Sequence, residues 1–133
     1  MTTRRSRQRG FTLIELMVVI SIIVILMSVA IPRYQASILR ARETVLRDDL
    51  YTLRSVIDQY TLDKQKAPQS LQDVVDAGYL KQLPKDPFTS TRESWVQVTD
   101  DSIMSPDQSQ PGIVDVHSGS DQTSSEGTAY STW

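Results

Sequence analysis

One carboxylate, that of Glu15, lies inside an apolar run that extends from Phe11 to Ile31 and holds no other ionisable side chain. A charged group in a segment suited to a membrane is costly, so such groups usually bind or position a partner. Gly10 and four arginines precede the run. We interpret Glu15 as a functional group at the start of a membrane helix, in preference to a tolerated polar residue near the membrane edge.

Residues that usually perform catalysis are sparse in the rest of the chain. The sequence has no cysteine and one histidine, His117. A lone histidine rarely acts as a general base without a nucleophile and an orienting partner, so His117 is interpreted as a surface or packing residue. The sequence also has no Gly-rich phosphate loop and no His-rich metal cluster. These features predict a protein that is not an enzyme.

Acidic residues gather in the second half of the chain. The formal net charge is −2, but residues 86–133 hold eight acidic residues and a single basic residue, Arg92. An acidic, solvated surface does not favour nucleic acid, and no nucleic-acid partner is predicted. The 133 residues suffice for a membrane segment and one small domain.

The apolar run is long enough to cross a membrane. Its 21 residues would form a helix of roughly 30 Å, the thickness of the hydrocarbon core of a bilayer. The arginines before it predict a cytoplasmic N-terminus and an outward C-terminus. The alternative is an ordinary secretory signal peptide, but the run is longer than such segments usually are and no A-x-A-like cleavage site follows it.

A helical pattern continues after the apolar run. We expect one helix from Phe11 to about Asp63, kinked or loosened at Pro32. Its second part is amphipathic, with Val45 and Val56 widening an apolar stripe. The positions of that stripe are Leu39, Leu46, Leu50, Leu53, Ile57 and Tyr60. Oppositely charged residues four apart predict two ion pairs along the helix, Glu43–Arg47 and Arg54–Asp58.

The remaining segments predict a small α+β head. Ser70 has the features of an N-cap and Gly78 those of a C-terminal stop, so a short second helix lies between them. Residues 95–99 and 113–116 read as two short strands. We predict that these strands form an antiparallel sheet packed on the long helix, and that Tyr130 and Trp133 dock on the core.

The start of the chain resembles a known class of signal. The run Gly10-Phe11-Thr12-Leu13-Ile14-Glu15-Leu16 behind a basic leader is similar to that of type IV pilins and type II secretion pseudopilins. A second segment, GYLKQLPKDP at residues 78–87, resembles the major pseudopilins of type II secretion. The resemblance implies a pilin-like fold, cleavage by a prepilin peptidase after Gly10 and N-methylation of Phe11. It also implies that Glu15 pairs with the amine of Phe11 on a neighbouring subunit during assembly.

The resemblance divides the chain into a leader peptide (1–10), a transmembrane and filament-core segment (11–31) and a periplasmic head (32–133). Within the head, 32–63 would be the second half of the long helix and 64–133 the short helix, loops and sheet. The implied function is a structural subunit of a periplasmic pseudopilus, anchored in the bacterial inner membrane by a single helix. The implied partners are further copies of the chain, minor pseudopilins, the prepilin peptidase and methyltransferase, and the inner-membrane assembly platform.

Two alternatives stay open. One is a major or minor pilin of a type IV pilus, which has the same type of N-terminus; the missing cysteines and the segment at 78–87 favour the pseudopilin. The other is a membrane-anchored periplasmic enzyme or binding module, which would need a reactive constellation that this small head does not show. Replacement of Glu15 by alanine should abolish assembly of a filament subunit and leave an anchored enzyme active.

The resemblance also raises the question of calcium. The major pseudopilins bind calcium in a C-terminal loop that ends in a tryptophan, here Trp133. Asp121 matches one carboxylate of that site, but the second would fall at Ala129. Glu126, Ser125 and main-chain carbonyls could replace the missing ligand, since calcium takes six to eight oxygens. The alternative is a solvated acidic loop without metal, so calcium is a possible cofactor and no other is implied.

Overall fold

The computed structural model describes residues 10–101, 106 and 110–133. Its elements follow the order α1 (Leu13–Lys64), α2 (Leu71–Asp76), β1 (Val96–Asp100), β2 (Gly112–His117) and a 3-10 turn η1 (Tyr130–Thr132). The chain separates into two compact units, Met1–Ile38 and Leu39–Trp133. Residues 1–9 of the predicted leader lie outside the described part of the chain.

The first unit contains the start of helix α1. Thr12 precedes it, and the Thr12 hydroxyl accepts a hydrogen bond from the Glu15 amide at 3.3 Å, as an N-cap does. The side chains that follow Glu15, up to Ile31, are apolar apart from Ser21 and Ser28, and all of them are exposed. By length and composition this is the one helix of the described chain that could cross a membrane. The prediction of a helix that is long and apolar enough to cross a membrane is therefore confirmed.

The two serine side chains within this apolar segment are satisfied by the helix itself. The hydroxyl of Ser21 donates to the carbonyl of Met17 at 2.8 Å, and that of Ser28 donates to the carbonyl of Ile25 at 2.7 Å. Pro32 lies inside α1, and the helix is assigned on both sides of it. Because proline has no N–H, it cannot donate to the carbonyl four residues earlier, at Ser28. The kink at Pro32 stays a prediction.

The second unit is built on the C-terminal part of α1. The predicted apolar stripe is buried at Leu46, Leu50, Leu53, Ile57 and Tyr60 and half-buried at Leu39. Val45 is 48% exposed, so the expectation that it widens the stripe is wrong. It lies one residue off the helical repeat of the stripe and faces away from the core.

The short helix α2 forms where its capping residues predict it. The Ser70 hydroxyl accepts from the amide of Asp73 at 3.2 Å, and an Asp73 carboxyl oxygen accepts from the Ser70 amide at 3.0 Å, which completes a capping box. Gly78 follows the helix with a φ of +86°, a backbone conformation that glycine adopts without strain. Leu71 and Val74 are the buried residues of α2.

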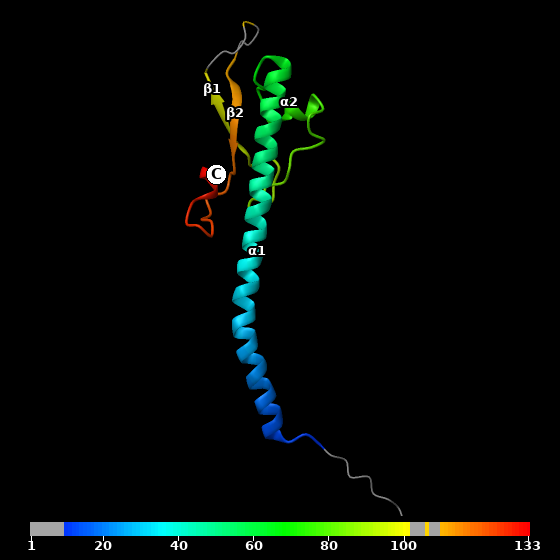
Figure 1. Ribbon diagram of the computed structural model, residues 1–133, viewed down its shortest axis with the longest axis vertical. Coiled ribbons are helices and arrows are strands. Elements are labelled where there is room, and N and C mark those ends of the chain that lie inside the picture. Colours follow the sequence, from blue (N-terminus) through cyan, green and yellow to red (C-terminus); the bar gives the residue numbers. More distant parts are fainter. Residues whose placement is uncertain (1–9, 102–105, 107–109) are drawn as a thin grey trace, which may run out of the picture. The chain divides into compact units, whose positions relative to one another are not determined.

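The two strands form the predicted antiparallel sheet (Figure 1). Val96 pairs with His117 and Asp100 with Gly112, with an irregular step between Val98 and Thr99. All of β1 is exposed. Ile113 and Val116 of β2 are fully buried against the helix, so β2 supplies the layer that covers the apolar stripe. An added Cβ at Gly112 would overlap the Cβ of Ala67, so this close approach requires glycine.

One apolar core joins the helix, the sheet and the C-terminal segment. Tyr130 is fully buried in it, and Trp133 packs at its edge, as predicted. The ring of Tyr130 stacks on Phe88 at 3.8 Å between centroids and meets Trp133 edge-on at 5.1 Å. The other buried members of the core are Leu46, Leu50, Leu53, Ile57, Leu71, Trp95, Ile113 and Val116. The predicted pilin-like α+β fold, a long apolar helix packed on a small sheet with a short second helix, is confirmed.

Candidate functional site

The predicted processing and assembly residues lie together at the start of α1. Gly10 and Phe11 are exposed ahead of the helix, Phe11 by 88%. Glu15 is exposed in the first helical turn. A Cβ added to Gly10 would meet no atom within 4 Å, so nothing in the described packing requires glycine there. A requirement for glycine would come from an outside partner.

The electrostatics at this helix start favour negative charge. The unpaired backbone amides of a first turn carry roughly half a positive charge, and an acidic residue nearby is stabilising. The hydrogen bond from Glu15 to Thr12 is made by the main-chain amide of Glu15. The carboxylate itself forms no hydrogen bond or ion pair with the described residues. Its charge is therefore available to a cation supplied from elsewhere.

A second constellation lies where the C-terminal loop meets α1. Glu43 is only 3% exposed. One of its carboxylate oxygens accepts from the Ser125 amide at 2.6 Å and from the Tyr130 hydroxyl at 2.9 Å. The other accepts from the Ser125 hydroxyl at 2.6 Å. One helix carboxylate thus holds two residues of a loop that lies more than 80 positions later in the sequence.

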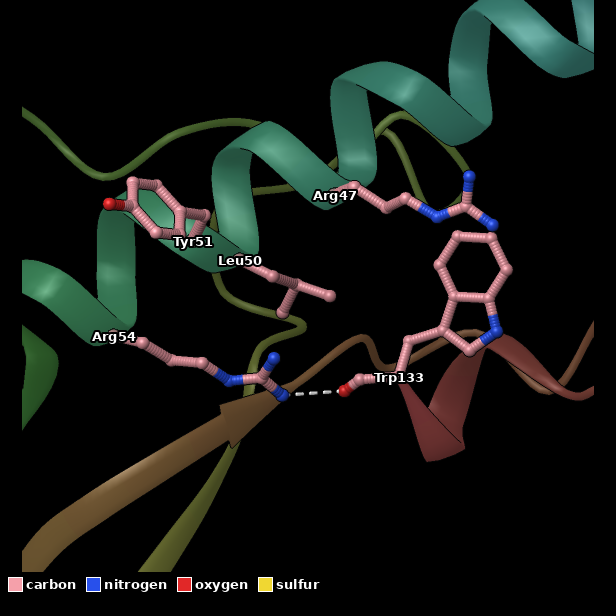
Figure 2. Close-up of a pocket in the computed structure, with 5 residues that line it drawn as sticks. All are labelled: Arg47, Leu50, Tyr51, Arg54 and Trp133. Carbon is pink, nitrogen blue, oxygen red and sulfur yellow. Dashed lines mark hydrogen bonds between the residues drawn. The ribbon is translucent and has the colours of Figure 1, made fainter.

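Two arginines of α1 contact the C-terminal segment and line a shallow groove beside it (Figure 2). The groove has a volume of about 300 Å³ and is lined by Arg47, Leu50, Tyr51, Arg54 and Trp133. The guanidinium of Arg47 lies over the Trp133 ring at 4.4 Å and pairs with Glu126 at 3.0 Å. Arg54 donates to the main-chain oxygen of Trp133 at 2.6 Å.

Arg54 also ties the sheet to the helix. Its Nε donates to the carboxylate of Asp115 at 2.6 Å and a terminal nitrogen donates to the carbonyl of Val116 at 3.0 Å. Both predicted ion pairs along the helix, Glu43–Arg47 and Arg54–Asp58, are replaced in the structure by contacts to the loop and sheet. These partners are 61 or more positions away in sequence, and the spacing of charges along one helix gives no information about them.

The pKa values follow these contacts. Burial by itself raises the pKa of Glu43, but hydrogen bonds from Ser125 and Tyr130 and the charge of Arg47 outweigh it and lower the pKa below its ordinary value. Burial also raises the pKa of Asp115, and the hydrogen bond and charge of Arg54 overcome it in the same way. Burial, followed by the hydrogen bond to Glu43, raises the pKa of Tyr130 to about 12.

Two of the three predicted calcium ligands, Ser125 and Glu126, have protein partners in the structure. Asp121 is exposed, the amide and hydroxyl of Ser125 both donate to Glu43, and Glu126 pairs with Arg47. Among the residues that the structure describes, no group of three or more acidic, histidine or cysteine side chains could hold a metal ion. Main-chain carbonyls would therefore have to supply most of the six to eight oxygens that calcium takes.

His117 has a packing role, in line with its interpretation from the sequence. Its Nδ1 lies 2.7 Å from the main-chain oxygen of Trp133, and its Nε2 lies 3.6 Å from the carboxylate of Asp115.

Sequence reasoning missed Glu43, although a signal was present. Glu43 is four residues after Leu39 and three before Leu46, so it occupies a position of the buried stripe. A charged residue in such a position predicts a buried, paired carboxylate.

These observations define a class of protein: a membrane-anchored, pilin-like subunit with a small α+β head. The family model described as "Prokaryotic N-terminal methylation motif" matches residues 5–31. The type IV major fimbrial protein FimA of Dichelobacter nodosus is 43% identical over 65 residues, which cover 49% of this chain and 41% of that protein. No solved structure matches.

Relatives that also cover the head narrow the class. The type II secretion system core protein G of Klebsiella pneumoniae is 35% identical over 128 residues, which cover 84% of each chain. The protein of the same name in Escherichia coli K12 is 36% identical over 98 residues, or 62% of this chain and 68% of that one. The chain belongs to the family of type II secretion core protein G, the major pseudopilins, which are structural proteins and not enzymes.

Proposed function

We propose that this major pseudopilin is cleaved between Gly10 and Phe11, is methylated on the new N-terminal amine, and then polymerises into a periplasmic filament. It is held in the inner membrane by the first part of α1, with its N-terminus in the cytoplasm and its head in the periplasm. A prepilin peptidase and methyltransferase would process it. Further copies of the chain, minor pseudopilins and the inner-membrane assembly platform would be its filament partners.

The single observation that carries this proposal is the contrast within α1. Every residue of α1 up to Ile31 is exposed, and Glu15 is the one ionisable side chain among them. A helix that is apolar all round needs lipid or other apolar helices around it. The head, by contrast, has a buried apolar core of its own. Polymerisation through the first unit would satisfy the helix and leave the head intact.

Glu15 would select the register of that polymerisation. Cleavage would create a charged amine at Phe11, next to the positive end of its own helix, where a cation is disfavoured. The Glu15 carboxylate of a second copy would relieve this charge. At about 4 Å such a pair is worth about 4 kcal/mol at an effective dielectric constant of about 20, compared with about 1 kcal/mol in water. Because desolvation of both ions opposes the gain, only a well-aligned pair would be stabilising.

Intact mass of the membrane-extracted protein tests the processing step first. We expect the loss of residues 1–10 and the gain of one methyl group on Phe11. An uncut leader, or a cut close to Ala30, would contradict the proposal and return the chain to the secreted or simply anchored class.

Filament formation then tests the role of Glu15. We expect Glu15→Gln to remove filaments while the processed protein still accumulates in the membrane, because the variant keeps the shape of the side chain and removes its charge. Ser28→Ala is the matched control, since the Ser28 hydroxyl bonds only within its own helix at 2.7 Å. Filaments of normal yield from Glu15→Gln would exclude the charge pair.

The second candidate function is a type IV pilin, favoured by the fimbrial relative that matches about half of this chain. The core protein G relative covers the head as well, and this supports the pseudopilin. The two functions predict different defects in a strain that lacks the gene. Deletion of the gene should block secretion of folded proteins to the medium if the chain is a pseudopilin, and should abolish surface fibres if it is a pilin.

A further inference from the structure

The C-terminal loop of this chain is folded around an acidic side chain of the helix. In the segment from Gln122 to Trp133, the Ser125 amide, the Ser125 hydroxyl and the Tyr130 hydroxyl all point their hydrogens at Glu43. A carboxylate gathers N–H and O–H donors, whereas a calcium ion gathers carbonyl and carboxylate oxygens. The two ways of ordering a loop therefore require opposite orientations of its polar groups, and this loop has the orientation that suits the carboxylate.

The residues around Glu43 strengthen that arrangement. Arg47 pairs with Glu126 at 3.0 Å and lies over the Trp133 ring at 4.4 Å, so its positive charge lies beside one of the predicted calcium ligands. Inside the loop, the Ser124 amide donates to the carbonyl of Thr128 at 2.7 Å. The indole N–H of Trp133 donates to the hydroxyl of the same threonine at 2.8 Å. Bonds between protein groups thus hold the loop together.

One departure from the family pattern fits this arrangement. The second calcium carboxylate implied by the resemblance to major pseudopilins would stand at position 129, where this chain has Ala129. The next residue, Tyr130, is fully buried and donates its hydroxyl to Glu43 at 2.9 Å. A hydrogen-bond donor to the helix carboxylate therefore lies beside the place of the missing ligand.

We propose that Glu43 and Arg47 replace the calcium ion in this chain, so that the C-terminal loop folds and stays ordered without metal. The loop is then insensitive to calcium and to chelators. If the proposed filament function also holds, filament assembly is independent of calcium as well. That last consequence rests on the proposed function, and the behaviour of the loop does not.

Hydrogen exchange on the full chain in detergent micelles tests the loop directly. In the unmodified protein, we expect the amides of residues 122–133 to exchange at the same rate in millimolar calcium chloride and in excess EGTA, and the thermal midpoint of the head to be equal in both. Slower exchange or a higher midpoint with calcium, absent with magnesium, would overturn the proposal.

Variants test the residues that we assign. Glu43→Gln should speed exchange in residues 122–133 by tenfold or more, in calcium and in EGTA alike, while protection of α2 stays unchanged. Asp48→Ala, which removes an exposed carboxylate of the same helix, is the matched control and should leave exchange unaltered. If Glu43→Gln fails to fold, Ser125→Ala and Tyr130→Phe each remove one of the three bonds and should speed exchange by a smaller factor. Wild-type exchange in these variants would contradict the assignment.

Discussion

Replacement of Asp86 by alanine should be one of the most destabilising single changes in the head. Asp86 is fully buried at the junction between the proline-flanked segment and the turn after β2. One of its carboxyl oxygens accepts from the amides of Phe88 at 2.8 Å and Thr89 at 3.3 Å. The other accepts from the hydroxyl of Ser118 at 2.6 Å. Three donors thus depend on one side chain.

The magnitude follows from the burial of those donors. Ser118 is also fully buried, and a buried hydroxyl left without an acceptor costs about 1–3 kcal/mol. The two amides lie in a half-buried turn, and each lost bond there is worth about 0.5–1.5 kcal/mol. We expect Asp86→Ala to lower the free energy of unfolding by about 2–6 kcal/mol. For a head of this size, that corresponds to a fall in the melting temperature of roughly 10 °C or more.

Urea denaturation of the full chain in detergent micelles, followed by tryptophan fluorescence, measures the loss. Trp95 is a suitable probe because it is buried and its indole N–H donates to the carbonyl of Pro84, two residues before Asp86, at 2.9 Å. Asp58→Ala, at an exposed position of α1, is the control and should stay within about 0.5 kcal/mol of the unmodified protein.

A double-mutant cycle with Ser118→Ala separates the hydrogen bond from general damage. Because the two side chains share a bond, their effects should fall short of additivity by about 1–2 kcal/mol. Additive effects, or a loss below about 1 kcal/mol for Asp86→Ala, would refute the argument that this carboxyl group organises the turn.

Three further predictions concern the packing and charges of the head. Leu53→Ala should cost about 2–5 kcal/mol in urea denaturation because Leu53 is 1% exposed, whereas Val45→Ala, at a position 48% exposed, should cost less than about 0.5 kcal/mol. Gly112→Ala should destabilise the head because the new methyl group meets Ala67, and Ala67→Gly should recover part of the loss; equal stability of the single variant would contradict this. The pKa of Asp115 is lowered in the fold, so its pairing with Arg54 stabilises the head fully at pH values above the unfolded pKa of about 3.9. This stabilisation is lost as the pH falls through the folded pKa. Asp115→Asn should therefore flatten the pH dependence of the melting temperature in that range.

The elements of the fold could be predicted because each has a local signal. The stripe of α1 repeats every three or four residues, Ser70 and Asp73 cap α2 within one turn, and the strands carry β-branched residues. The candidate processing and assembly residues could be proposed in the same way, because Gly10, Phe11 and Glu15 lie within six residues of one another. Local patterns of this kind need no knowledge of tertiary contacts.

The contacts of the charged residues could not be predicted in the same way. Glu43 binds Ser125, and Arg54 binds Asp115, across 82 and 61 positions respectively. The pairs four apart on the helix offered a plausible alternative that is worth only about 0.2–0.5 kcal/mol. A partly buried loop contact competes successfully with so small a term. The prediction of calcium concerns the same loop, and it stays a prediction.

Two carboxylates on one helix have different surroundings, and under the proposed function they have different roles. Glu43 is buried and receives three hydrogen bonds from its own chain, so its interactions are complete within the head. Glu15 is exposed on an apolar segment, and its carboxylate has no partner among the described residues. An unpaired charge in lipid is costly, and a second copy of the chain can supply the missing cation. A carboxylate saturated in its own subunit stabilises the head, whereas we propose that one left unsaturated on the apolar segment favours association.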